Sequence, residues 1–195
     1  MPDKAQDPRH ARSRSALVAA MTDLLDERDF AAITITELVG RAKVTRPTFY
    51  QHFRDLPGIA RAASLARLES AFPTEPDLVE GQSDAARASA VEHTALGLLQ
   101  HLHGRVDFYR RVIGGASAVE LYDDFVTLLE TRITRLSRAT VPTATGSGPS
   151  IEDRRAVLSG GLTWLIIRWL HSDFCDHNAS PVMARRVAAA VVAFT

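Results

Sequence analysis

Apolar residues recur along almost the whole chain at the three- and four-residue spacing of an amphipathic helix. No segment shows the alternating pattern of a half-buried strand. The pattern therefore predicts an all-α fold of about nine helices. The first helix is expected to begin near Arg12 and to end near Arg28. Its buried stripe comprises Leu17, Ala20, Met21, Leu24 and Leu25.

Two short helices joined by a tight turn are expected next. Thr34 and Glu37 have the spacing of a capping box at the start of the first of them, which ends near residue 42. Thr45 stands where it can cap the second, which runs from Arg46 to Phe53. This arrangement is typical of a helix-turn-helix.

The remaining helices form a larger body. A fourth helix follows Asp55 and ends before the Pro-rich segment 73–77, and five further helices are expected at 83–101, 105–114, 117–138, 151–171 and 180–193. The predicted organisation is a flexible basic arm at 1–12, a helix-turn-helix domain at 13–56 and a larger helical domain at 57–195. Residues 139–150, rich in Pro, Thr, Gly and Ser, are expected to form a flexible loop.

Composition narrows the class of protein. With 195 residues, 46% hydrophobic and 24% charged, the chain resembles an ordinary globular protein. It has no apolar run of about 18 residues and no apolar signal core, so we expect a cytoplasmic location. The single cysteine, Cys175, excludes an intramolecular disulfide. No catalytic set or phosphate loop is visible, so neither an enzyme nor a cofactor is expected.

The formal net charge is zero, so a DNA-binding function requires basic residues to be concentrated locally. Basic residues are partly concentrated in this way. Three arginines lie in the N-terminal arm, and four further basic residues lie around the helix-turn-helix. These residues are Arg9, Arg12, Arg14, Arg41, Lys43, Arg46 and Arg54.

The second short helix surrounds two apolar residues, Phe49 and Phe53, with polar ones. Hydroxyls and free amides at its start can bind phosphates, whereas Arg46 and Gln51 have donors suited to base edges in a major groove. On pattern alone, a surface helix that is merely capped and solvated is equally compatible.

The order and spacing of three segments resemble the TetR family of transcriptional regulators. The segments are 34–39, 42–45 and 46–53, and the run Thr48-Phe49-Tyr50-Gln51-His52-Phe53 is the most specific part. The resemblance implies a homodimer with an N-terminal DNA-binding headpiece, which is usually a repressor released by a small effector. It assigns effector binding and dimerisation to the domain at 57–195, and by matching positions it places at the operator Thr36, Thr45, Arg46, Pro47, Thr48, Tyr50 and His52. We add Thr34 and Gln51 as further candidates for contacts with DNA.

Three positions depart from the family pattern. Lys43 replaces the usual turn glycine, and a positive φ there would cost on the order of 1 kcal/mol. Leu56 stands where many members have a phosphate-binding lysine, so one contact to the DNA backbone is expected to be lost. Pro47 replaces a commoner glycine and offers an apolar surface for a thymine methyl group.

Two recognition helices of a dimer enter successive major grooves about 34 to 36 Å apart, so this function requires a dimer interface. We expect it on the last two helices, where small and apolar residues lie at helical spacing. The candidates are Leu158, Gly161, Leu162, Leu165, Trp169, Met183, Val187 and Val191. The alternative is that these residues form the core of the body itself.

The aromatic residues of the body are candidates to line an effector cavity, although core packing is the commoner role. They are Phe72, Phe108, Tyr109, Tyr122, Phe125 and Trp164. Arg168 lies within an apolar run and is a candidate to pair with an acidic effector or with a carboxylate across the dimer, unless it simply extends to solvent. Histidines near 101–103 and 171–177 lack diagnostic metal-ligand spacing, so no metal is expected.

Two functions thus stay open: a repressor released by a small apolar or amphipathic effector, and an accessory DNA-binding regulator without a ligand.

Overall fold

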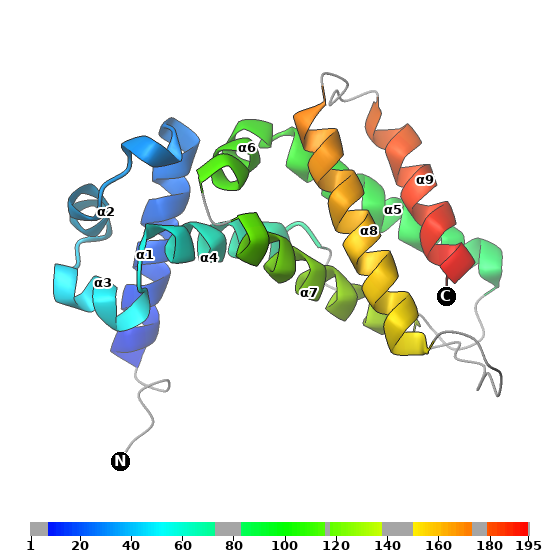
Figure 1. Ribbon diagram of the computed structural model, residues 1–195, viewed down its shortest axis with the longest axis horizontal. Coiled ribbons are helices and arrows are strands. Elements are labelled where there is room, and N and C mark those ends of the chain that lie inside the picture. Colours follow the sequence, from blue (N-terminus) through cyan, green and yellow to red (C-terminus); the bar gives the residue numbers. More distant parts are fainter. Residues whose placement is uncertain (1–7, 73–82, 116–117, 138–149, 173–178, 195) are drawn as a thin grey trace, which may run out of the picture. The chain divides into compact units, whose positions relative to one another are not determined.

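The computed structural model describes residues 8–72, 83–115, 118–137, 150–172 and 179–194. Within them the chain forms nine α-helices and one 3-10 turn (Figure 1). The all-α prediction is therefore confirmed. The expected linker at 73–77, the loop at 139–149 and Cys175 lie outside the described residues. None of the described helices is long and apolar enough to cross a membrane.

The elements follow in chain order. They are α1 (Pro8–Glu27), η2 (Phe30–Ala32), α2 (Ile35–Ala42), α3 (Arg46–His52), α4 (Leu56–Glu69), α5 (Asp84–His103), α6 (Val106–Gly115), α7 (Ala118–Ser137), α8 (Ile151–His171) and α9 (Ala179–Phe194). The first helix begins at Pro8 and not near Arg12, so residues 8–12 of the expected flexible arm are helical. Proline suits such a start because its fixed φ is helical and its missing N–H is not needed there.

By its internal contacts the chain divides into two units. Unit 1 comprises Met1–Arg67 and Asp107–Leu121, and unit 2 comprises Leu68–Val106 and Tyr122–Thr195. The predicted boundary after residue 56 separates α4 from the helix-turn-helix. The contacts instead place most of α4 and nearly all of α6 in the same unit as α1, α2 and α3.

The core of unit 1 is formed around α1. The predicted stripe is confirmed, because its five residues are the buried residues of this helix. Leu38 and Val39 of α2 and Phe49 of α3 are buried as well, and in Figure 1 these three helices lie side by side. Burial of these apolar side chains fixes the position of α3 relative to α1.

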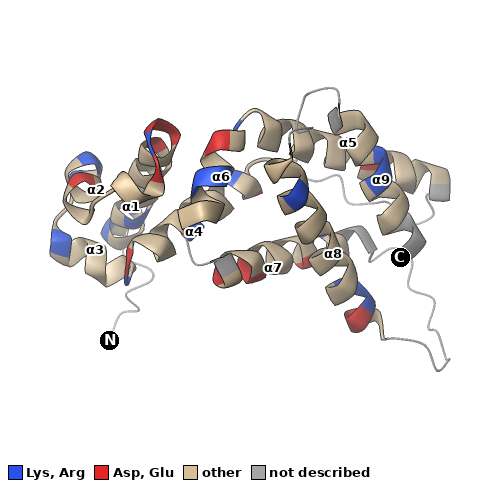
Figure 2. Cartoon of the chain, turned by 45° about the horizontal axis from the view of Figure 1, so that its top comes forward, with Lys and Arg blue, Asp and Glu red and all other residues tan. Residues whose placement is uncertain are grey.

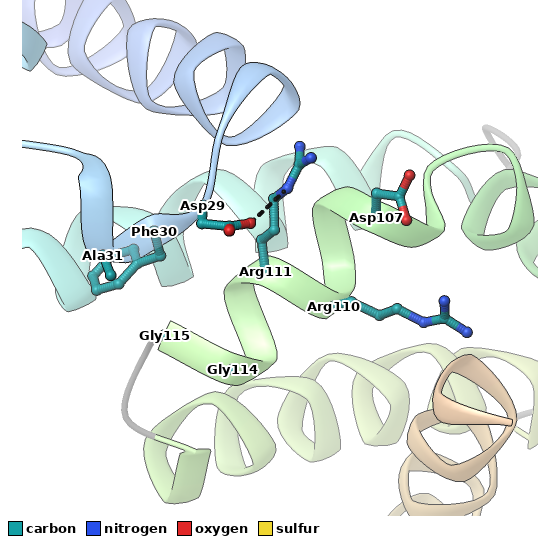
Figure 3. A pocket seen from close by; sticks show the side chains of 8 residues that line it. All are labelled: Asp29, Phe30, Ala31, Asp107, Arg110, Arg111, Gly114 and Gly115. Carbon is teal, nitrogen blue, oxygen red and sulfur yellow. Dashed lines mark ion pairs between the residues drawn. The ribbon is translucent and has the colours of Figure 1, made fainter.

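Two arginines connect α4 and α6 to the end of α1 through hydrogen bonds. Arg67 of α4 donates two hydrogen bonds of 2.6 Å to the carboxylate of Asp26. Arg111 of α6 donates to the carbonyl oxygens of Leu25 and Asp26 at 2.9 and 2.8 Å. Figure 3 shows the same side chain reaching Asp29, with 3.3 Å between Nε and Oδ1. Arg111 thus satisfies carbonyls that the helix end leaves without partners.

Unit 2 has a separate core between α5, α7, α8 and α9. Its buried residues are Val91, Leu129, Ile133, Leu158, Leu162, Ala188 and Val191. In Figure 1, α5, α8 and α9 run close together. Helix α8 starts with a capping box, in which Ser150 and Asp153 each accept from the other's backbone N–H.

The turn between α2 and α3 contains the only non-glycine residue of the described chain with positive φ, Lys43 at 54°. The N–H of Lys43 donates to Gly40 and that of Val44 donates to Val39, which closes the end of α2 as a Schellman motif. Lys43 therefore adopts the positive φ for which the sequence analysis gave a cost.

A Lys43→Gly variant should be more stable than the wild type by about 1 kcal/mol, because glycine adopts this backbone without the Cβ clash. Thermal unfolding followed by circular dichroism measures the difference. Lys43→Ala keeps a Cβ at this left-handed position and is a matched variant that should not gain stability. An unchanged melting temperature in Lys43→Gly would contradict the expected strain.

Candidate DNA-binding site

Threonine hydroxyls begin both helices of the helix-turn-helix. The Thr34 side chain accepts a hydrogen bond from the N–H of Glu37, and Thr45 accepts one from the N–H of Thr48. The expected reciprocal half of the first capping box is not formed, because the Glu37 carboxylate pairs with Arg28. Both helix starts are nevertheless fixed by side chains.

Helix α3 is anchored by its aromatic residues and presents its polar ones. Phe49 is fully buried and Phe53 is 9% exposed, and their rings lie 6.2 Å apart. Tyr50 is the opposite case, because 58% of it is exposed although its ring is in edge contact with Phe49. Of the residues predicted at the operator, Thr48 and His52 are half-buried and the others are exposed, namely Thr34, Thr36, Thr45, Arg46, Pro47, Tyr50 and Gln51.

Arg46 is held in a fixed direction. Its Nη2 donates to the Oγ1 of Thr36 on α2 at 2.6 Å. The Oγ1 atoms of Thr45 and Thr48 lie 2.9 Å apart beside it. A guanidinium with one N–H engaged in this way keeps further donors for an acceptor pair on a base edge.

Several charged side chains near this surface are neutralised by ion pairs. Arg41 of α2 donates to both carboxylate oxygens of Glu27, and these hydrogen bonds hold the pKa of Glu27 below its ordinary value. Arg28 bridges Glu27 and Glu37. Figure 2 shows the basic segments on α2 and α3 and the acidic ones at the end of α1. Arg41 is thus already neutralised, whereas Arg46 faces solvent with a neutral hydroxyl partner.

His52, which the family resemblance places at the operator, is turned toward α1. Its Nε2 lies 2.7 Å from the Oγ of Ser13, and its ring lies 4.0 Å from that of His10. Since Ser13 donates to the carbonyl oxygen of His10, Nε2 is the donor to Ser13. Nδ1 is buried without a partner. The sequence offers no signal for this contact, because Ser13 and His52 are 39 positions apart.

Because of this environment, the contribution of His52 to the stability of the folded protein depends on pH. Burial, with the charges of His10 and Arg14 nearby, holds the pKa of His52 below its ordinary 6.5. Between the lowered and the ordinary pKa the unfolded chain binds more protons than the folded one. The stability contributed by neutral His52 is therefore complete above about pH 6.5 and is lost as the pH falls below it.

We expect the melting temperature of the wild type to fall more between about pH 7.5 and about pH 5.5 than that of a His52→Gln variant, in which this position no longer titrates. Differential scanning calorimetry at the two pH values measures the difference. A parallel loss of stability in both proteins would refute the assignment.

The candidate cavity residues are divided between the units. Phe108 and Tyr109 are buried in unit 1, where Arg67 lies 4.1 Å from the Phe108 ring centroid. Phe72 and Phe125 are packed in unit 2, and the hydroxyl of Tyr122 donates to the Gly160 carbonyl at 2.9 Å. Trp164 is 56% exposed. These six residues line neither of the two cavities described, of about 470 and 410 Å³.

The candidate dimer residues are likewise divided. Leu158, Leu162 and Val191 belong to the core of unit 2, and Val187 packs against it, so these side chains are already covered within one chain. Leu165, Trp169 and Met183 line the cavity of about 410 Å³ together with Arg168. Gly161 alone of the predicted set is exposed. The large exposed apolar residues of α8 are Ile151, Val157 and Trp164.

Comparisons with known proteins agree with this architecture. Residues 16–63 match the family model described as bacterial regulatory proteins, tetR family. The chain is similar in structure to the TetR family repressor AlkX from Dietzia sp., which is implicated in biodegradation of n-alkanes. The TM-score is 0.56 at 17% identity, over 91% of this chain and 94% of that one. No curated protein matches.

The helix-turn-helix, its exposed polar surface and the all-α body define a DNA-binding transcriptional regulator fold. More particularly, the predicted resemblance to the TetR family is confirmed over residues 16–63, which match the model of that family.

Proposed function

We propose that this chain is a homodimeric repressor that binds a pseudo-palindromic operator through α3 and is released by a small apolar or amphipathic effector bound in its helical body. It acts in the cytoplasm as a binding protein and not as an enzyme. The observation that carries the proposal is the surface of α2 and α3, where Arg46, Pro47, Tyr50 and Gln51 are exposed around the buried Phe49.

The roles on this surface follow from its geometry. Arg46 and Gln51 read base edges, while the hydroxyls of Thr34, Thr45 and Thr48 and the phenol of Tyr50 bind phosphates. Thr36 orients Arg46 through the 2.6 Å hydrogen bond. His52 positions α3 against α1 through Ser13 and does not itself contact DNA.

The homodimer is supported by the outward face of α8. Val157, Gly161, Trp164 and Arg168 are exposed and follow one another at intervals of four, three and four residues, so they form one stripe along the helix. Val157 is 65% exposed and Trp164 is 56% exposed. Large apolar side chains arranged in this way mark a protein interface more often than a solvated surface.

The proposal is tested by fluorescence anisotropy with the DNA that flanks the coding region of this protein. Wild-type protein should bind one segment at physiological salt, with Tyr50→Ala binding much more weakly while retaining the wild-type circular dichroism spectrum. Binding that is indifferent to Tyr50→Ala would remove α3 as the recognition helix. A monomer by sedimentation at the binding concentration would refute the dimer.

A second candidate is a regulator without an effector. It is favoured by the burial of Phe108, Tyr109 and Phe125 in packed cores. Thermal unfolding in the presence of a panel of fatty acids, alkanes and aromatic amphipaths separates the two. A compound that raises the melting temperature and releases the operator supports the repressor released by an effector. Absence of both effects across the panel favours the second candidate.

A further inference from the structure

A cavity of about 470 Å³ lies within unit 1, between η2 and one face of α6 (Figure 3). Its volume falls within the range of small-molecule sites. The residues that line it from α6 follow the spacing of a single helix face. They are Asp107, Arg110, Arg111, Gly114 and Gly115, and the opposite wall consists of Asp29, Phe30 and Ala31. None of these residues belongs to the operator surface or to the stripe on α8.

Arg111 presents a fixed donor edge to this cavity. Its Nη1 donates to the carbonyl oxygens of Leu25 and Asp26, which holds the guanidinium in place. Within the described chain, Nε has one contact, at 3.3 Å to Asp29, and Nη2 has none. Nε and Nη2 together form an edge that binds a carboxylate through two parallel hydrogen bonds. The structure therefore holds a carboxylate-binding edge with one of its two donors unused.

The Asp29 carboxylate is only weakly held on this edge. Its side chain is 84% exposed, and it makes no capping hydrogen bond at the start of η2. An ion pair exposed to this degree is weak, because water competes for the carboxylate and ordering the side chains costs entropy. A ligand carboxylate can therefore displace Asp29 from Arg111 at small cost.

An apolar surface lies beside the donor edge. Phe30 is half-buried and lines the cavity, and a Cβ at Gly114 would meet nothing within 4 Å, so the backbone of α6 is bare there. Asp107 and Arg110 are both exposed and have opposite charges, so together they add no net charge to the lining. Figure 3 shows Arg110 pointing away from Asp29. The cavity thus combines one fixed guanidinium with an apolar wall.

We propose that this cavity binds a small carboxylic acid whose carboxylate takes the place of Asp29 on the Nε–Nη2 edge of Arg111. The apolar part of the acid packs against the Phe30 ring and the bare backbone at Gly114. The site lies entirely in unit 1 and is separate from the effector site proposed for the helical body. Binding at this site requires neither a dimer nor DNA.

Isothermal titration calorimetry with naphthoate tests the proposal, because this probe joins one carboxylate to an apolar ring system. The wild type should bind naphthoate, and the uncharged analogue naphthamide should bind about 10-fold more weakly, since it lacks the charge-assisted hydrogen bonds. Gly114→Leu fills the cavity and should abolish binding. Gly97→Leu on α5, where a Cβ also meets nothing within 4 Å, is the matched control and should bind as the wild type does.

Three further variants test the donor edge itself. Arg111→Lys keeps the positive charge but loses the planar fork, so it should bind naphthoate about 10-fold more weakly. Asp29→Asn removes the carboxylate that competes for the edge and should bind naphthoate about threefold more tightly. Asp107→Asn removes the other acidic residue of the lining, which does not contact Arg111, and should change the affinity less. Circular dichroism spectra check that each variant is folded.

Several results would overturn the proposal. A wild type that does not bind naphthoate, or that binds naphthamide equally well, would show that the cavity does not select a carboxylate. Binding that persists unchanged in Gly114→Leu and Arg111→Lys would place the probe elsewhere, and the effector site proposed for the body would be unaffected. Weaker binding to Asp29→Asn would show that Asp29 supports the ligand and is not displaced by it. Operator binding and dimerisation are measured separately, so the proposed repressor function stands or falls independently.

Discussion

An Arg46→Ala variant is expected to bind its operator about 100-fold more weakly than the wild type. A bidentate contact from arginine to guanine contributes about 1–3 kcal/mol, and a dimer makes it twice. Arg46 is exposed at the first position of α3, and its hydrogen bond to Thr36 holds it before DNA arrives. Fluorescence anisotropy at a fixed salt concentration measures the loss.

Two further variants separate base reading from general attraction to DNA. Arg105→Ala removes the same charge from unit 2 and should change affinity little. Thr36→Val keeps the guanidinium of Arg46 but removes its hydrogen-bond partner. This variant should therefore lose more affinity for the operator than for unrelated DNA. Equal losses on both kinds of DNA for Arg46→Ala would assign this residue to a phosphate and not to a base.

Local sequence signals predicted most of the helix-turn-helix. The buried stripe of α1 and the threonine caps of α2 and α3 depend on residues a few positions apart, which a sequence displays directly. The left-handed Lys43 also follows from the need to close α2 within one turn. The orientation of His52 does not, because its partner Ser13 is brought to it only by the packing of α1 on α3.

The sequence pattern of α8 did not predict which of its faces is buried within the same chain. The helix is apolar almost all round, so periodicity does not tell which side faces the core of the same chain. Leu158 and Leu162 are buried in that core. Val157 and Trp164 are left outside. An interface predicted from size and hydrophobicity alone therefore selects residues that one subunit has already buried.

The last glycines of α6 provide a matched pair with opposite expected effects. A Cβ at Gly115 would clash with the Cβ and the ring of Phe30, whereas a Cβ at Gly114 would meet nothing within 4 Å. Both residues and Phe30 belong to unit 1 and surround the cavity in Figure 3. In Gly115→Ala the whole side chain of Phe30 must move, including its Cβ and so the backbone that carries it, and such overpacking costs about 1–3 kcal/mol.

We therefore expect Gly115→Ala to lower the melting temperature by several degrees and Gly114→Ala to raise it, since alanine is favoured over glycine within a helix by about 1 kcal/mol. Scanning calorimetry measures both. The double variant Phe30→Gly with Gly115→Ala should lose less than the sum of its parts, because removing the Cβ and the ring at position 30 makes room for the new methyl group. Additive losses in that cycle would show that Gly115 is required for another reason than its contact with Phe30.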